Sequence, residues 1–420
     1  MKFFYLCFIQ LALCFTLLSQ QAHAYPALTN KQAKANSKAT QTSSHQQKNA
    51  SLKETMDELN NTLNSLFPLI SSLQEFKLEK NEPQISTNLN KMIQVFNKVG
   101  HQNFIKSPTL SHSITVMSEH LQGTAQAFNL NFKEYAYSKV KATLHVCLSC
   151  HSQLPKFKRK ISNNIGMLGR SDFKKDSDYA DYLMMLRRYD EAIQIHKKNI
   201  RENLSKIDDK SPIEQKLFND EISKSLSNLI IIYTKVLNSP SNLKQLLQEY
   251  QNEKKIASYL KEDIKIWIDQ IIRWQKDSLK FSLTPKNDKE IDEYLNIVLE
   301  STKEELREKA YLLNLPLLFS SGVLERYLYQ NPNSKSAPKI LFLVSLSERQ
   351  LIRNYYFSLS DLFLKQCIIK YGDTSYGKDY AKKCYDEYEE NVIFGFTGSS
   401  GTNLPKENIN ELQRLKTYIK

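Results

Sequence analysis

Apolar residues recur every three or four positions along most of this chain, a spacing that places them on one face of an α-helix. Ser51 followed by Glu54 matches a capping box, which begins many helices. Only 10 residues of the chain are glycine, and long stretches lack proline, which disfavours a multi-stranded β fold. The sequence therefore predicts an all-α protein. The first apolar stripe consists of Leu52, Met56, Leu59, Leu63, Leu66 and Ile70.

Three more helices are expected before residue 165. They cover residues 83–100, 107–129 and 132–155, and their ends coincide with proline, glycine or asparagine, which interrupt helices. Short connections make consecutive helices antiparallel neighbours. Residues 51–165 are therefore predicted to form an up-down-up-down four-helix bundle.

The amino terminus has the pattern of a secretory signal peptide over residues 1–24. Lys2 precedes an apolar run over residues 3–18, and the small residues Ala22 and Ala24 follow. The run is shorter than the roughly 20 apolar residues of a spanning helix, so we expect cleavage and no membrane span in the mature chain. Residues 25–50 are polar and predict a flexible linker. The expected location is periplasmic or secreted.

After a domain boundary near residues 166–171, helical periodicity resumes, and prolines interrupt it near residues 212, 240, 285, 332 and 338. This pattern predicts an α-solenoid of helix pairs over residues 172–420. Ala180 and Ala192 resemble the small residues at which the two helices of a tetratricopeptide (TPR) unit touch. A second segment, residues 340–372, resembles the same family. Residues 212–330 fit a helical solenoid but depart from that family's consensus.

The strongest chemical signal is the CxxCH sequence of Cys147, Cys150 and His151. Two thiols three positions apart can form thioethers with the two vinyl groups of haem, and the adjacent imidazole can ligate the iron. A zinc site would need a second Cys/His pair at metal spacing, and a redox-active CxxC would need a thioredoxin-like strand. Because neither is present, we expect one covalent haem c.

With its CxxCH in the last helix, the segment of residues 51–160 resembles the cytochrome c-prime family. The resemblance covers about a quarter of the chain and rests on this motif and on the number of helices. In that family the sixth iron position is filled from the first helix, often by Met, or is vacant. The residues alone favour Met56 as a core filler, and the resemblance implies it as a ligand, so both interpretations stay open. His101 and His112 are alternatives at the same end of the bundle.

The net charge of +13 is unevenly distributed. Residues 51–170 carry 14 Lys and Arg against 8 Asp and Glu. We expect this excess to attract an acidic redox partner protein, although a solvated basic surface with no partner is the alternative. Export and the lack of a recognisable motif argue against a nucleic-acid partner. Four basic residues follow the motif directly, namely Lys156, Lys158, Arg159 and Lys160.

Two cysteines remain, Cys367 and Cys384, on two successive expected helices joined by a turn at Gly372. An oxidising compartment and antiparallel neighbouring helices favour a disulfide between them, and free thiols are the alternative. The glycine-rich segment of residues 395–401 is expected to be a loop, because it follows a helix and lacks the Lys-Ser/Thr ending of a phosphate-binding loop.

These features predict an exported mono-haem electron-transfer cytochrome with a helical-repeat arm that binds a protein partner. A haem-based gas or ligand sensor, and a TPR-type periplasmic scaffold with a structural haem domain, are the alternatives. An enzyme is not expected, since His196 is the only histidine after the motif and no acid–base set stands out.

Overall fold

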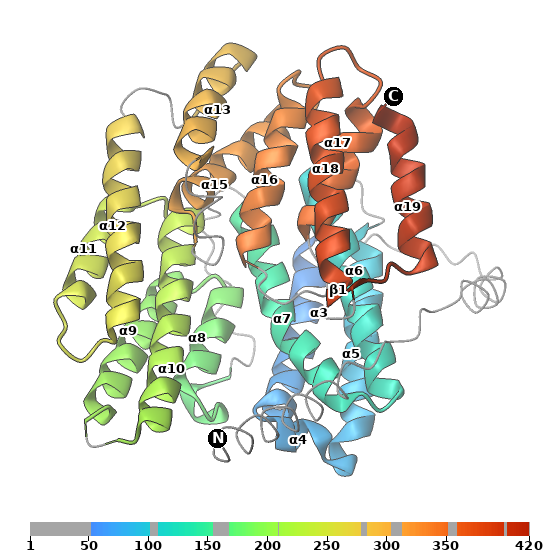
Figure 1. Ribbon diagram of the computed structural model, residues 1–420. Coiled ribbons are helices and arrows are strands. Elements are labelled where there is room, and N and C mark those ends of the chain that lie inside the picture. The colour runs from blue at the N-terminus through green and yellow to red at the C-terminus, as the bar shows by residue number, and fades with distance from the viewer. Residues whose placement is uncertain are drawn as a thin grey trace, which may run out of the picture. The chain divides into compact units, whose positions relative to one another are not determined.

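A computed structural model describes residues 52–100, 108–153, 168–208, 210–278, 284–303, 313–351, 359–398 and 401–419 (Figure 1). The expectation of an all-α protein is confirmed, because the described residues are helical apart from turns and one short hairpin. Residues 49–404 and 410–420 form one compact unit, and every contact given below lies within it. The expected signal peptide and linker, residues 1–50, lie outside the described residues.

The first helices pack against one another in chain order. Helix α3 contacts α5, α5 contacts α6, and α6 contacts α7, while α4 and η1 reach α7. The three expected helices after residue 82 are thus present, with ends within a few residues of the expected positions. The elements are α3 (Leu52–Leu66), η1 (Phe67–Ile70), α4 (Leu73–Lys77), η2 (Glu79–Asn81), α5 (Glu82–Gly100), α6 (Pro108–Asn129) and α7 (Lys133–Gln153).

The first helix ends earlier than its apolar stripe suggests. Helix α3 stops at Leu66, and the stripe continues through the 3₁₀-helix η1. Pro68 explains the change, because its ring excludes the α-helical hydrogen bond of its own nitrogen and crowds the preceding turn. Ile70 is nevertheless buried in η1, so the apolar stripe predicts burial correctly where it extends past the helix.

The later part of the chain is a succession of helices that begin at the expected breaks. Helices α10 and α11 start at Pro212 and Pro240, where the absent N–H of proline costs nothing. The elements are η3 (Arg170–Asp172), α8 (Asp176–Met185), α9 (Tyr189–Lys206), α10 (Pro212–Ile231), η4 (Ile232–Val236), α11 (Pro240–Gln251), α12 (Ser258–Ser278), α13 (Asp288–Lys303), α15 (Leu315–Gln330), α16 (Ala337–Leu351), α17 (Leu359–Tyr371), α18 (Lys378–Gly395), β1 (Thr397–Gly398), β2 (Gly401–Thr402), α19 (Lys406–Lys416) and η5 (Thr417–Ile419).

Neighbouring helices in this part pack in sequence, from α8 to α9 to α10, from α11 to α12, and from α15 through α18. Ala180 of α8 and Ala192 of α9 are both fully buried, and α8 packs against α9. The first helices contact the later ones as well, since α7 contacts α8 and α15, and α6 contacts α15 and α17 (Figure 1). Helix α15 is buried on nearly all sides, with 13 of its 16 residues in the interior.

The segment expected to be a loop near residue 398 contains a small hairpin instead. Strand β1 pairs antiparallel with β2, with Thr397 opposite Thr402 and Gly398 opposite Gly401. Gly401 has φ +97°, a backbone conformation that is favourable only for glycine. Each strand has only two residues, and no periodicity distinguishes a strand this short from a loop.

Candidate functional site

The CxxCH motif lies within α7, whose backbone is helical from Lys133 to Gln153. Residues three apart share one face of an α-helix, so Cys147 and Cys150 lie one above the other and His151 follows around the axis. The side chains of residues 144–153 lie outside the described residues, as do Lys156, Lys158, Arg159 and Lys160.

The turn between α6 and α7 makes these two helices antiparallel neighbours. It is three residues long, and Asn131 there has φ 65°, a left-handed conformation that Asn tolerates better than most residues. Glu134 in the first turn of α7 forms an ion pair with Lys77 of α4, with 2.9 Å between Oε1 and Nζ. The carboxyl end of α7, with the motif, is thus at the opposite end from this turn.

Three hydrogen bonds show which residues of α3, α5, α6 and α7 lie at the same level along the helix axes. Lys98 Nζ lies 3.3 Å from Glu58 Oε2, Ser118 Oγ donates to Asn97 Oδ1 at 2.8 Å, and His120 Nε2 lies 3.2 Å from Thr143 Oγ1. A helix rises about 1.5 Å per residue. When the paired residues are taken as level and this rise is added along each helix, Met56 lies within about one helical turn of the level of Cys147.

Met56 is half-buried and packs against the apolar core. Its surroundings are those of a core methionine, whereas its level along the helix axes is that of the motif. Both roles are compatible with this position, so ligation of iron by Met56 stays a prediction. His112 lies in α6, eight residues before His120 and towards the motif end of the helix, with an undescribed side chain. His101 lies outside the described residues.

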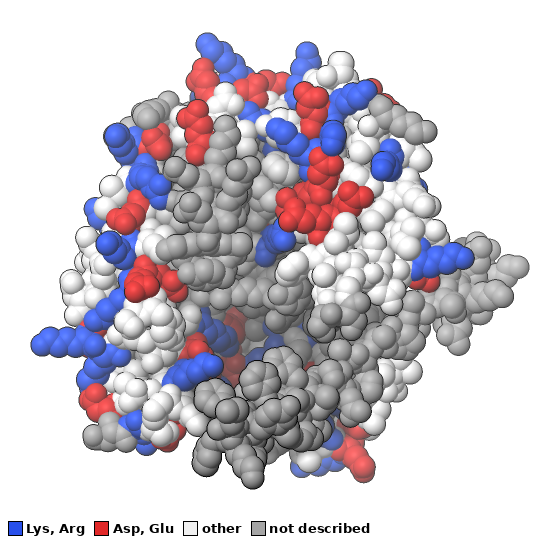
Figure 2. All heavy atoms as spheres, viewed as in Figure 1, with Lys and Arg blue, Asp and Glu red and all other residues white. Residues whose placement is uncertain are grey.

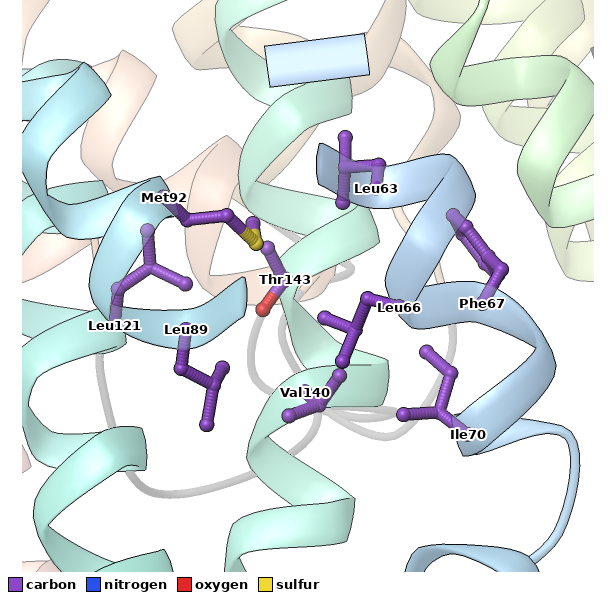
Figure 3. Close-up of a pocket in the computed structure, with 9 residues that line it drawn as sticks. All are labelled: Leu63, Leu66, Phe67, Ile70, Leu89, Met92, Leu121, Val140 and Thr143. Atoms are coloured by element: carbon purple, nitrogen blue, oxygen red, sulfur yellow. The ribbon is translucent and has the colours of Figure 1, made fainter. Parts of the chain in front are cut away.

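The interior enclosed by the first helices is apolar and nearly closed at the height of Thr143 (Figure 3). Its cavity has a volume of about 10 Å³, which is room for about one water molecule. Side chains from α3, η1, α5, α6 and α7 converge on it, and Thr143 is the one polar residue among them. The lining residues are Leu63, Leu66, Phe67, Ile70, Leu89, Met92, Leu121, Val140 and Thr143.

This interior provides a test of whether a haem group fits. A porphyrin is far larger than the cavity, so it cannot lie at the height of Thr143, one turn before Cys147. Nearer the motif the neighbouring helices present buried apolar side chains, which suit an apolar macrocycle. These are Leu59, Phe96, Ile114 and Met117. The residue types around the motif are thus those that a haem site needs, namely two cysteines one turn apart, an adjacent histidine and apolar neighbours.

His120 of α6 is a buried histidine next to this interior that sequence analysis missed. Its Nε2 donates to the Lys139 carbonyl of α7 at 2.7 Å, which leaves Nδ1 without a hydrogen-bond partner among the described residues. Burial, together with the nearby Lys139 charge, lowers the pKa of His120 to about 4, so the ring is neutral at pH 7. Its position beside an apolar stripe carries no signal that distinguishes it from a surface residue.

His196 of α9 is the second buried histidine. Its side chain is fully buried, and neither ring nitrogen has a hydrogen-bond partner among the described residues. Burial lowers the pKa of His196 to about 4, although the Asp181 carboxylate opposes the shift. A neutral imidazole in the interior is therefore a structural residue at pH 7, and nothing described brings it to the motif.

The disulfide lies far along the chain from the motif. The structure places a bond between Cys367 of α17 and Cys384 of α18, with Cα atoms 6.3 Å apart. Both cysteines are fully buried.

The described surface carries no continuous basic patch on the face in Figure 2, where Lys and Arg lie interspersed with Asp and Glu.

Among the described side chains, no group of three or more His, Cys, Asp or Glu is arranged to hold a metal ion. Within the same residues, no helix has both the length and the apolar character needed to cross a membrane. Comparisons with family models, with curated proteins and with solved structures gave no match to this chain.

Proposed function

We propose that this chain is an exported mono-haem c-type cytochrome that transfers electrons. The observation that supports the proposal most directly is the unbroken helix α7 through the CxxCH motif, which keeps Cys147 and Cys150 on one face with His151 beside them. Residues 51–165 act as a four-helix haem bundle, and residues 172–420 act as a TPR-like solenoid that binds a protein partner.

Haem c, when bound, supplies an iron that changes oxidation state by one electron. The role of the chain is to tether the macrocycle through Cys147 and Cys150, to ligate the iron with the neutral imidazole of His151, and to exclude water with apolar side chains. Met56 is the proposed sixth ligand, with His101, His112 and a vacant position as the alternatives. The basic segment after the motif attracts an acidic redox partner in the periplasm.

The test is to express the full chain together with haem-attachment machinery and to wash the denatured protein with acid acetone. We expect the haem spectrum to stay with the polypeptide. Cys147→Ser with Cys150→Ser should give colourless protein, whereas Cys367→Ser with Cys384→Ser should keep the colour. His151→Gln should change the spectrum of the reduced protein. The matched variant is His145→Gln, at a histidine of α7 two residues before the motif that is not an expected ligand, and it should keep the spectrum. Wild-type protein that is colourless after the wash would refute the proposal.

A haem-based gas or ligand sensor is the second candidate. It is supported by the packing of α7 on α8 and α15, because this packing links the motif helix to the later helices. A sensor requires a vacant sixth position, so the reduced wild-type protein should bind carbon monoxide at once. If Met56 ligates the iron, carbon monoxide should bind slowly to wild type and rapidly to Met56→Leu. A scaffold with a structural haem is the third candidate, and a protein that exchanges no electrons with any acidic partner would favour it.

A further inference from the structure

Three titratable side chains meet in the interior of the later helices, apart from the CxxCH motif. Lys235 lies in η4, Glu325 in α15 and Glu348 in α16. None of the three side chains is exposed to solvent. The Lys235 ammonium donates to Glu348 Oε1, and it lies 3.7 Å from Glu325 Oε1. Two carboxyl groups and one ammonium thus share a site without access to bulk water.

The backbone around this site explains how the lysine comes to lie inside. The segment η4 is a π-helix that continues α10, and such an irregular turn changes the direction of the side chains it carries. Helix α15 approaches η4 closely at Gly322, where a Cβ atom would lie 3.2 Å from the Lys235 carbonyl oxygen. Gly322 is one turn before Glu325 on the same helix, so this close approach brings the carboxyl group to the ammonium.

The charges of the site do not balance if all three groups are ionised. Two carboxylates and one ammonium leave one negative charge in the interior, and a buried carboxyl group normally takes up a proton instead. Neither oxygen of Glu325 has a hydrogen-bond partner among the described residues. A proton on Glu325 would make it a donor, and the Glu348 carboxylate, which already accepts from Lys235, is within its hydrogen-bonding reach.

The electrostatic surroundings of Glu325 agree with this charge balance. The pKa of Glu325 is raised to about 8, mainly by burial and in part by the Glu348 carboxylate. Lys235 acts in the opposite direction, as does Arg326, the neighbour of Glu325 in α15. Burial alone would lower the pKa of Lys235, but Glu325 and Glu348 raise it, so the ammonium stays charged.

We propose that Lys235, Glu325 and Glu348 form a proton-binding site in which Glu325 holds one proton and releases it to solvent base in mildly alkaline solution. Release leaves two carboxylates around one ammonium, and their repulsion weakens the packing of α15 against η4 and α16. Helix α15 also contacts α6 and α7. The site thus makes the packing of α15 depend on pH, and this holds whatever the function of the CxxCH motif is.

The first test is infrared spectroscopy of the full-length protein. At about pH 7 the wild type should show the C=O stretch of a protonated, buried carboxylic acid, and this band should disappear by about pH 9.5. The band should be absent from Glu325→Gln at both pH values. Glu293→Gln is the matched control, because Glu293 is an exposed glutamate of α13, and this variant should keep the band. A difference spectrum without a Glu325 band at pH 7 would overturn the proposal.

The second test uses Glu348→Gln, which removes the like charge and leaves Lys235 and Glu325 in one-to-one balance. The pH at which the Glu325 band disappears should fall by at least about one unit, a tenfold change in proton affinity. An unchanged or higher midpoint would contradict the assignment. This variant also decides the question if Glu325→Gln does not fold.

The alternative occupant is a monovalent metal ion that balances the same charge. In that case the urea midpoint of the wild type would follow the concentration of sodium or potassium and would not change between about pH 7.5 and 9.5, where His120 and His196 are neutral in both the folded and the unfolded chain. This outcome refutes the proton site. The proposal expects the reverse, with a midpoint that falls across this range in the wild type and stays constant in Glu325→Gln.

Discussion

Lys141 of α7 and Asp178 of α8 form an ion pair with 2.6 Å between Nζ and Oδ1, six residues before Cys147 on the helix of the motif. The exposed fractions of the two side chains are 25% and 11%, so the pair is largely shielded from water. It is a polar link between the two helices. A rotation or shift of α7 would either move α8 with it or break this pair.

The first prediction concerns this pair. Asp178→Asn should lower the free energy of unfolding by about 1–3 kcal/mol, because Lys141 loses its counter-charge in a mostly buried position. Urea unfolding at pH 7 measures the loss. The control is Asp386→Asn, since Asp386 pairs with Lys382 on the surface and exposed pairs contribute about 0–1 kcal/mol. Equal losses in the two variants would contradict the assigned role.

The second prediction concerns His196 and acid. Its pKa of about 4 in the folded protein is below the ordinary value of 6.5, so between these values the unfolded chain takes up a proton that the folded chain does not. Stability is therefore lost as the pH falls through this range. His196→Leu should remove the part of this loss that His196 causes, and it should be about 1–2 kcal/mol more stable than wild type at pH 5. Urea midpoints at pH 5 and pH 8 test it, and an unchanged slope between them would refute it.

The third prediction separates His120 from His196. His120 donates a buried hydrogen bond to the Lys139 carbonyl, whereas His196 has no hydrogen-bond partner among the described residues. His120→Leu should therefore cost about 1–3 kcal/mol at pH 7. His196→Leu should be neutral or stabilising at the same pH. Thermal unfolding of the two variants side by side gives the comparison, and a gain in His120→Leu would show that its hydrogen bond is unimportant.

The fourth prediction concerns the disulfide between α17 and α18. Its cysteines are 17 residues apart in the sequence, and closing a loop of this length stabilises a fold by about 2–4 kcal/mol. Cys367→Ser with Cys384→Ser should lose this amount in urea unfolding. Added reductant should destabilise the wild type and leave the double variant unchanged. A response of the double variant to reductant would indicate that another cysteine pair accounts for the effect.

Much of the helical structure could be predicted from the sequence, because the residues that begin and end helices act locally. Proline at the start of α6, α10 and α11 fixes where each helix begins, and the capping box of Ser211 and Glu214 reinforces the start of α10. The early end of α3 follows from Pro68, a signal that was present but was outweighed by the apolar stripe. The two-residue strands of the hairpin carried no signal at all.

The buried polar groups could not be predicted, because their surroundings come from distant parts of the chain. Lys235 and Glu348 are 113 residues apart, and either one read alone resembles a surface residue of an amphipathic helix. His120 is buried by contacts with α7 that no spacing within α6 reveals. The candidate site was predictable in a different way, since CxxCH is a contiguous motif whose chemistry depends on five consecutive residues.

The contacts of α6 with α15 and α17 bear on how this chain is made. Helix α17 begins about 230 residues after α6 ends, so the apolar surface of α6 has no partner there until most of the polypeptide has been synthesised. Contacts between such distant segments slow folding, and uncovered apolar surface favours aggregation. Efficient production of this protein therefore depends on keeping the nascent chain apart from other copies until its last third emerges.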